Sequence, residues 1–527
     1  MTENEKKKSS LIRQGSILSL LTLGSRVLGL VREMVKAALL GTSVLSDAFT
    51  VAFMIPNLLR RLFAEGSIAV AFIPTFKGFL IEGDKAKTKE FLSAFFTLVS
   101  FSVTIVVMLG VLAAPLVVPI FGMEALDETV FLTRLMFPFL ALISIAAFFQ
   151  GILNTVNIFA PTGFAPILLN ISAIVCALAL SPLTKNPARA MAIGILIGGF
   201  LEAAIQLPFV LKQGFRFPLA GLKRAFTNPG TRTVLRLIGP TIIGMAAYQL
   251  NDLVSTALAG NAGPGVVSSL QFSLRLQELI LGVFAVSIGT VLLPDLAGHA
   301  KSGRWADYND RLIAAMDIIA LITIPITFFA LVQGETLVRL LFQARSFDEE
   351  SVRLTTTAFF FHIPGLFFIA LNRILAPAFY AQSDSKSSTA AGLVAFVVNM
   401  ALAALLVGPM KGGGVALALT LASVVNTLLL LLFLSRNPQV AVSRALRSAS
   451  VYALKLVAFS LIAVAPLYIW GDSLRRIFAG KGRLVSQGVP LIISALVFAV
   501  IGTGLLIITQ DQQVRSISKR LRRPRGR

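Results

Sequence analysis

The sequence predicts an all-α polytopic membrane protein with about 14 transmembrane helices. Of its 527 residues, 56% are hydrophobic and only 14% are charged, which is far more apolar than a soluble domain. Apolar runs of about 20 residues, the length that spans a bilayer, recur along the whole chain. Two of them read LSAFFTLVSFSVTIVVMLGVLAAPLVV and LIISALVFAVIGTGLLIIT. The stretches between such runs are too short to form a soluble domain.

Interruptions by Gly, Pro and charged residues divide the apolar runs into fourteen predicted helices. They are residues 15–42, 46–80, 90–118, 129–156, 163–182, 188–211, 234–259, 267–298, 309–332, 352–381, 387–408, 413–435, 449–471 and 486–509. The basic N-terminal sequence contains no small-residue cleavage site before Arg26, so we expect an uncleaved first helix rather than a signal peptide. An even number of spans places both termini on one side of the membrane.

Lysine and arginine are concentrated in the connections on one side of these helices. They include the loop GDKAKTKE, the segment 212–236, the loop HAKSGRWADYNDR and the tail KRLRRPRGR. Since cationic loops stay in the cytoplasm, both termini are predicted to be cytoplasmic. The basic loop DSLRRIFAGKGR falls on the opposite side and disagrees with this assignment.

The two halves of the chain resemble each other. Residues 67–78 read SIAVAFIPTFKG and residues 287–298 read SIGTVLLPDLAG, which favours a six-helix repeat over chance similarity between apolar helices. We therefore expect two pseudo-symmetric six-helix lobes and two further helices. The predicted division is 1–211 (N-terminal lobe), 212–233 (cytoplasmic interfacial linker), 234–435 (C-terminal lobe) and 436–527 (last two helices and basic tail).

The charge and cysteine content exclude several classes of protein. The net charge of +22 is carried mainly by residues that flank helices, so we expect contact with anionic membrane lipids and no binding of nucleic acid. Cys176 is the only cysteine, which rules out a disulfide within the chain and a cluster of thiol ligands.

Several charged residues fall inside predicted helices, where charge is costly and marks function. Arg26 and Glu33 are seven residues apart and can pair on one helix face, whereas Arg32 points about a third of a turn away. On the second helix the spacing places Asn57 beside Arg60.

Four arginines, namely Arg26, Arg32, Arg60 and Arg275, together supply more positive charge than nearby carboxylates need as partners. They favour a hydrated anion-binding cavity, and the planar fork of arginine suits a diphosphate. The alternative is a set of snorkelling residues and ion pairs that fix helix register; a pair between Arg61 and Glu65 fits that alternative. Asp252 and Asn399 could hold a cation, although hydrogen bonding between helices is the commoner role of such residues.

Four stretches resemble one protein family. SRVLGLVRE, SDAFTVAFMIPNLLRRLFAEGSIAVAFIP, ILNTVNIFAPTGFAPILLNIS and SIGTVLLPDL are similar to signatures of the MurJ (MviN) lipid II flippases of bacteria, which belong to the multidrug/oligosaccharidyl-lipid/polysaccharide exporter superfamily. The resemblance covers essentially the whole chain. It implies lobes arranged in a V around a cationic cavity, with a groove on the last two helices for the polyprenyl tail of the substrate.

The resemblance also implies a function. Such a protein is a transporter and not an enzyme. It moves lipid II, the undecaprenyl-diphosphate-linked disaccharide-pentapeptide, to the periplasmic leaflet of the bacterial inner membrane by alternating access, without a cofactor and in the company of cell-wall synthesis proteins. A multidrug or other polyprenyl-linked saccharide exporter is the alternative.

The resemblance assigns roles to particular residues. The substrate-binding arginines of the family match Arg26, Arg32, Arg60 and Arg275, and Ser25 and Asn57 fall in matching motifs. Candidate gating or coupling residues are Asp47, Glu33 and Glu278, where Glu33 replaces the aspartate of many relatives. The sodium site of some members is matched only in part, by Asp252 and Asn399, so coupling to Na⁺ or H⁺ stays open.

Overall fold

Helices make up all the regular structure in the part of the chain that can be described. The computed structural model describes residues 3–62 and 71–515, and their side chains except in 3–16, 240–248 and 283–291. The α-helices of the first half are α1 (Glu3–Leu40), α2 (Val44–Arg60), α3 (Ile73–Glu82), α4 (Lys85–Val117), α5 (Leu126–Met136), α6 (Phe139–Thr155), α7 (Ala160–Thr184), α8 (Pro187–Lys212), α9 (Leu222–Thr227) and α10 (Pro229–Gly260). Those of the second half are α11 (Val266–Lys301), α12 (Trp305–Phe342), α13 (Glu349–His362), α14 (Gly365–Ala381), α15 (Ser385–Leu434), α16 (Val442–Ile477) and α17 (Val489–Ile508).

Each predicted helix coincides with helical structure in the described residues, although some of the predicted helices are broken or bent. The predicted helix 129–156 is broken at Pro138, between α5 and α6, and the predicted helix 352–381 is bent by 48° between α13 and α14, next to Pro364. Proline lacks the N–H that would continue the helix. The break predicted between helices 387–408 and 413–435 is present at Lys411, whose φ of 48° and ψ of −130° are not helical and mark a kink within α15.

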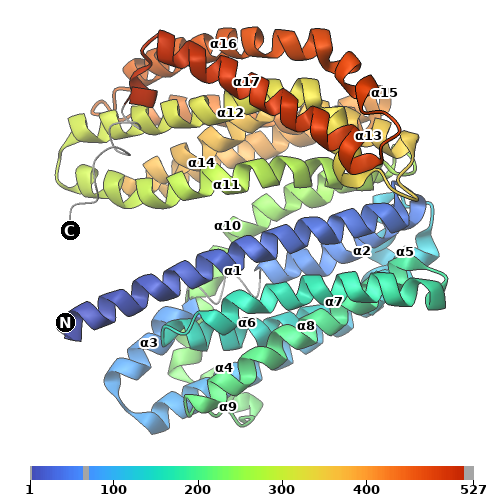
Figure 1. Cartoon of the computed structure of the whole chain (residues 1–527). Coiled ribbons are helices and arrows are strands. Elements are labelled where there is room, and N and C mark those ends of the chain that lie inside the picture. The colour runs from blue at the N-terminus through green and yellow to red at the C-terminus, as the bar shows by residue number, and fades with distance from the viewer. Residues whose placement is uncertain (1–2, 63–70, 516–527) are drawn as a thin grey trace. The chain divides into compact units, whose positions relative to one another are not determined.

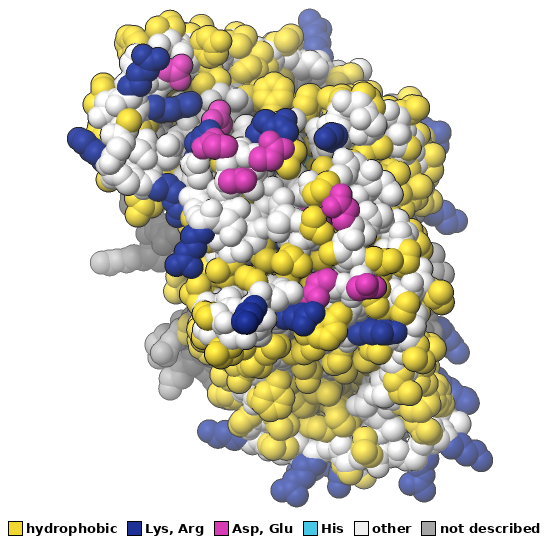
Figure 2. All heavy atoms as spheres, turned by 90° about the vertical axis from the view of Figure 1, so that its right-hand side faces the viewer, with side chains coloured by type: hydrophobic (Ala, Val, Ile, Leu, Met, Phe, Trp, Pro, Cys, Tyr) yellow, Lys and Arg dark blue, Asp and Glu magenta, His cyan; other side chains and the backbone are white. Residues whose placement is uncertain are grey.

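The surface is that of a multi-pass membrane protein. Within the described residues, eight helices are long and apolar enough to cross a bilayer, and the bent pair α13 and α14 would make a ninth. Large apolar side chains reach the surface on these helices, as for Leu116, Leu405 and Tyr468. In Figure 2 apolar side chains cover broad areas, while the charged ones gather on part of the face in view. The number of fourteen spans stays a prediction.

The chain forms two compact units, which are described separately below. Unit 1 comprises residues 1–268 with 344–347, and unit 2 comprises residues 269–343 and 348–527. In unit 1, α7 packs against α8 and α1, α6 packs against α8, and α2 packs against α5 (Figure 1). A Cβ on Gly194 would lie 2.8 Å from the Cα of Ala173, so the close approach of α7 and α8 depends on small residues.

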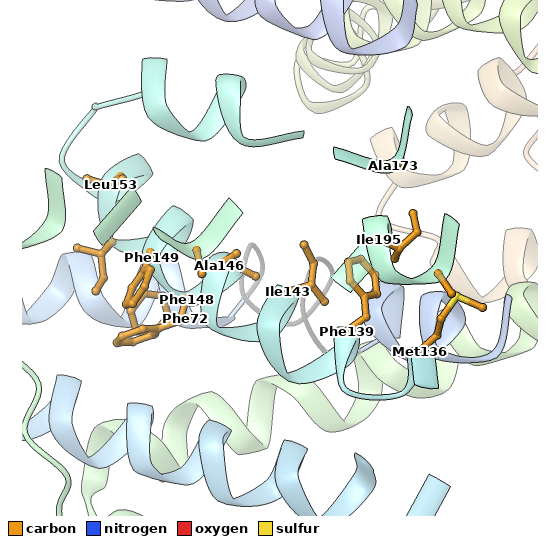
Figure 3. Packing of buried hydrophobic residues seen from close by; sticks show 14 of the residues in the cluster. Phe72, Met136, Phe139, Ile143, Ala146, Phe148, Phe149, Leu153, Ala173 and Ile195 are labelled. Carbon is orange, nitrogen blue, oxygen red and sulfur yellow. The ribbon is translucent and has the colours of Figure 1, made fainter. Parts of the chain in front are cut away.

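A cluster of aromatic rings forms the core of unit 1 (Figure 3). Phe72 is fully buried, and its ring centroid lies 4.8 Å from that of Phe95 and 5.5 Å from that of Phe148. Offset and tilted aromatic pairs of this kind add to the free energy gained by burying apolar area. The segment after α8 packs onto the same core, since the ring centroid of Phe217 lies 5.0 Å from that of Phe96. Its predicted place at the membrane interface stays a prediction.

Unit 2 is built around two pairs of long helices. α12 packs along α16, and α14 packs along α15, while α17 lies against α16. Ala320, Ile324, Leu456 and Leu506 form a small core shared by α12, α16 and α17. The repeat and the four-part division of the chain stay predictions.

Candidate functional site

The hairpin of α1 and α2 carries more positive than negative charge. From residue 26 to residue 61 the chain has five cations, Arg26, Arg32, Lys36, Arg60 and Arg61, and two carboxylates, Glu33 and Asp47. All seven side chains are described, and most of them are buried or half-buried. Buried charges need partners or a ligand.

Glu33 pairs with the residue next to it. Nη2 of Arg32 donates a hydrogen bond of 2.8 Å to Oε1 of Glu33, and the two side chains are only 13% and 10% exposed. The helix geometry alone favoured Arg26 as the partner of Glu33, because Arg32 leaves the helix in another direction. The long side chain of Arg32 bends back to reach the carboxylate. Glu33 thus neutralises a guanidinium that we expected to face a ligand.

The helical turn around Arg26 is exposed on one side and tied to α7 on the other. Arg26 itself is exposed. Its neighbour Ser25 accepts, through the backbone oxygen, a hydrogen bond of 3.3 Å from Nδ2 of Asn170 on α7. Ser25 therefore contributes its main chain to helix packing, and a role of its hydroxyl in substrate binding stays a prediction.

At the end of α2 the predicted neighbours lie together. Nε of Arg60 donates a hydrogen bond of 2.9 Å to Oδ1 of Asn57, which orients the guanidinium. Nη1 of Arg61 lies 3.4 Å from Oε1 of Gln249 and 4.0 Å from Oδ2 of Asp252, both on α10. The predicted partner of Arg61, Glu65, lies outside the described residues.

A buried lysine lies between the two helices of the hairpin. Lys36 is 4% exposed, and its Nζ donates a hydrogen bond of 2.6 Å to Oγ1 of Thr50 on α2. The ammonium also lies 5.6 Å from the ring centroid of Phe49, a distance at which the ring attracts a cation. Lys36 therefore links α1 to α2 near their connecting loop.

Asp47 binds the first turn of α11. It is 5% exposed. Its Oδ2 accepts a hydrogen bond of 2.6 Å from the backbone N–H of Gly265, and its Oδ1 accepts one of 2.7 Å from that of Ser268. The first N–H groups of a helix lack partners within the helix and carry partial positive charge. A carboxylate satisfies both needs, so Asp47 acts as a cap supplied from a distant part of the chain.

The local backbone makes this cap possible. Gly265 has a φ of +78°, and a Cβ at this position would lie 2.3 Å from the backbone oxygen of Thr42. Only glycine combines that conformation with such a close approach. At the same loop, Ser43 Oγ accepts a hydrogen bond from the N–H of Ser46, which caps α2 just before its first residue, Val44.

The fourth predicted arginine belongs to unit 2. Arg275 on α11 donates a hydrogen bond of 2.8 Å from Nη1 to Oε2 of Glu278, and these side chains are 35% and 53% exposed. Glu278 thus neutralises Arg275, as Glu33 neutralises Arg32. Because Arg26, Arg32 and Arg60 lie in unit 1, the convergence of all four arginines on one cavity stays a prediction.

The two residues of the predicted cation site also belong to different units. Asp252 on α10 lies near Arg61 as described above, and Asn399 on α15 is 1% exposed. Among the described residues, His, Cys, Asp and Glu form no group of three or more that could hold a metal ion. A bound sodium at Asp252 and Asn399 stays a prediction.

Sequence reasoning missed Lys36, Gly265 and Ser268 as members of the site. Lys36 was visible as a charge on an apolar helix, but its partner Thr50 is an ordinary helix residue. The stretch NAGPGVVSS does carry a signal, since glycines before an apolar helical run indicate a helix start able to bind an anion.

Comparisons with known proteins agree on one family. The family model described as lipid II flippase MurJ matches residues 36–479. A probable lipid II flippase MurJ from Treponema pallidum is 47% identical over 513 residues, which cover 96% of this chain and 97% of that protein. The lipid II flippase MurJ from Burkholderia cenocepacia is 33% identical over 424 residues, which cover 79% and 82%.

Solved structures show the same fold. A structure described as lipid II flippase MurJ in an inward closed conformation matches with a TM-score of 0.77 and 23% identity, over 93% of this chain and 99% of that one. An inward-facing multidrug resistance transporter of the MATE family and MOP superfamily matches with a TM-score of 0.67 and 13% identity, over 80% and 96%. At these identities the likeness concerns the fold alone.

Proposed function

This chain belongs to the MurJ family of lipid II flippases, and we propose that it carries lipid II from the cytoplasmic to the periplasmic leaflet of a bacterial inner membrane. It is a transporter and not an enzyme. The substrate joins a polar disaccharide-pentapeptide to an undecaprenyl tail through a diphosphate. A protein that moves it must lead the polar part through the membrane while the tail stays in lipid.

The observation that carries the proposal is the excess of cations on α1 and α2. Residues 26–61 carry five cations and two carboxylates, and this net positive charge attracts an anionic ligand. The hydrogen bond from Nε of Arg60 to Asn57 orients the guanidinium of Arg60. A guanidinium offers paired donors that match a diphosphate. Arg26, Arg32 and Arg60 are the proposed contacts, with Arg275 as a fourth.

Alternating access requires contacts that form in one state and break in another. Asp47 is our candidate for such a contact, because it caps α11 with two short hydrogen bonds to the backbone N–H groups of Gly265 and Ser268. Glu33 and Glu278 are further candidates, since each pairs with an arginine that the substrate would also attract. Release of these arginines to the diphosphate would couple binding to a change of state.

The distribution of Lys and Arg supports cytoplasmic termini. Coupling to Na⁺ or H⁺ and association with cell-wall synthesis proteins are further parts of the proposal. A multidrug exporter is disfavoured, because a site for organic cations would use acidic and aromatic groups rather than an excess of arginine.

Complementation tests the proposal. A bacterium depleted of its own lipid II flippase is supplied with this chain or with the variants Arg26→Ala, Arg32→Ala, Arg60→Ala or Arg275→Ala. Arg353→Ala is the matched control, because Arg353 is an exposed helical arginine paired with Glu350. We expect growth with the unaltered chain and the control, and poor growth with the four variants at equal expression. Growth with all four variants would contradict the proposed site.

A further inference from the structure

A polar cavity of about 890 Å³ lies in unit 2, apart from the residues discussed above. It is bounded by α12, by α16 and by the residues that follow α17. Arg444, Arg447 and Lys455 line it on α16, where spacings of three, eight and eleven residues bring them to one side of the helix. Asp317 from α12 and Asp511 after α17 complete the wall.

The cavity lies where three predicted spans meet the membrane surface. Asp317 directly precedes the apolar run IIALITIPITFFALV of α12, and Lys455 directly precedes LVAFSLIAVAPLYIW of α16. Asp511 comes three residues after the end of α17 at Ile508. Since all three residues mark the edge of an apolar run, the cavity is level with lipid headgroups.

The inner end of the cavity holds a well-satisfied carboxylate. Asp511 is 3% exposed and accepts hydrogen bonds from Nζ of Lys455 at 2.7 Å, from the Tyr452 hydroxyl at 3.1 Å and from the Val514 N–H at 3.2 Å. Burial raises the pKa of Asp511, but these hydrogen bonds and the charge of Lys455 together keep that pKa below its usual value. Lys455 and Asp511 therefore neutralise each other.

Asp317 and Arg447 differ from this neutralised pair, because within the described residues each can still accept or donate a further hydrogen bond. Asp317 is 8% exposed; its Oδ2 accepts a hydrogen bond of 3.2 Å from Nε2 of Gln513, while its buried Oδ1 has no hydrogen-bond partner among the described residues. Leaving a buried carboxylate oxygen without a donor is costly. At the outer end, the exposed Arg447 forms no ion pair with the part of the chain that is described, whereas Arg444 pairs with Asp310 at 3.0 Å.

We propose that this cavity binds a phospholipid whose headgroup carries both a primary ammonium and a phosphodiester, as phosphatidylethanolamine does. The ammonium lies at the carboxylate of Asp317, which lines the cavity and to which it donates a hydrogen bond, and the phosphodiester lies at Arg447. Charge complementarity supports this orientation, because the inner end offers an unsatisfied carboxylate and the outer end a guanidinium.

The surface outside the cavity suits the rest of such a lipid. Val451, which lines the cavity, is 63% exposed, and Leu454 on the same helix is 69% exposed. Acyl chains can follow these apolar side chains into the bilayer. An anionic lipid without an amine would satisfy Arg447 but leave Asp317 without a donor, so the ammonium is the discriminating group.

Native mass spectrometry of the full chain in detergent tests the proposal. The probes are phosphatidylethanolamine, phosphatidylglycerol with the same acyl chains, and water-soluble glycerophosphoethanolamine. The variants are Asp317→Asn and Arg447→Gln, with Arg353→Gln as a control because Arg353 is an exposed arginine of the same unit. We expect the unaltered chain and the control to prefer phosphatidylethanolamine over phosphatidylglycerol by about tenfold.

The two variants separate the two halves of the headgroup. Asp317→Asn should abolish the preference without weakening phosphatidylglycerol, and Arg447→Gln should weaken both lipids by about tenfold. Equal binding of the two lipids by the unaltered chain, or a preference that survives Asp317→Asn, would overturn the proposal. So would glycerophosphoethanolamine binding as tightly as the lipid. If Asp317→Asn fails to fold, Arg447→Gln decides, because it changes an exposed residue; unchanged binding of both lipids would then overturn the proposal.

Discussion

Replacing Asp47 by Asn exchanges one oxygen of the carboxylate that caps α11 for an NH₂ group. The carboxylate accepts hydrogen bonds of 2.6 Å from Gly265 N–H and 2.7 Å from Ser268 N–H. Asn offers one acceptor oxygen, so one of the two N–H groups would face an NH₂ group that cannot accept from it. The variant also removes a negative charge from a helix N-terminus.

The size of the effect follows from these two losses. A hydrogen bond to a charged group contributes about 1.5–3 kcal/mol, and the interaction of a charge with a helix terminus contributes about 0.3–1 kcal/mol, or more when it is partly buried. The first turn of α11 should therefore open more easily by about 2–4 kcal/mol. Since 1.4 kcal/mol is a factor of ten, exchange of its amides should speed up by roughly 30-fold to several hundredfold.

Hydrogen exchange of the full chain, followed by mass spectrometry of peptides that cover residues 262–272, measures this opening. Asp84→Asn is the matched control. Asp84 caps α4 through the N–H groups of Ala86 and Lys87 at 2.9 and 3.1 Å, but it is exposed, and Asn caps an exposed helix about as well as Asp. Exchange around Gly265 should not change in the control. Unchanged protection of residues 265–268 in Asp47→Asn would refute the assignment of Asp47 as the cap.

Three further changes test the packing of the chain by thermal unfolding in detergent. Gly265→Ala should lower the free energy of unfolding by more than about 1 kcal/mol. Gly263→Ala is the control, because Gly263 also has a positive φ but has open space around it, and its loss should be clearly smaller. Equal losses would contradict the close approach of Gly265 to Thr42. Thr50→Val removes an acceptor from the buried ammonium of Lys36 and should cost about 1–3 kcal/mol, so an unchanged melting temperature would argue against that bond. Because the pKa of Asp511 is lowered in the folded protein, the stability that Asp511 contributes is complete at neutral pH and is lost as the pH falls through that pKa. Asp511→Asn should therefore lower the melting temperature at pH 7 and reduce the further fall of the melting temperature below about pH 4. A fall below about pH 4 identical to that of the unaltered chain would contradict this.

Much of the fold was predictable because apolar length and helix punctuation are local signals. The predicted helices coincide with observed ones wherever the chain is described, and the membrane class and the family resemblance are confirmed. The errors lie at residues whose effect depends on context. Pro138 breaks a helix, whereas Pro325 lies within α12. By contrast, the break predicted between residues 408 and 413 is present as a kink at Lys411.

The site was less predictable because its contacts depend on tertiary structure. Spacing along one helix correctly placed Asn57 beside Arg60. Spacing did not reveal that Arg32 turns back to Glu33, because long side chains reach beyond the direction set by their Cα–Cβ bond. Nor did it reveal that Asp47 binds backbone N–H groups more than 200 positions later in the chain. Backbone N–H groups are the same in nearly every residue, so the sequence at the start of α11 does not indicate which distant side chain binds them.

The central claim is that arginines of α1 and α2 bind the diphosphate of a lipid-linked substrate. The most direct test is the Kd of undecaprenyl diphosphate for the purified full chain and for Arg26→Ala, Arg32→Ala and Arg60→Ala, with Arg353→Ala as the control. Loss of one charge-assisted contact should raise Kd by about tenfold or more in each variant and leave the control unchanged. A Kd that is the same in these three variants as in the unaltered chain would contradict the claim.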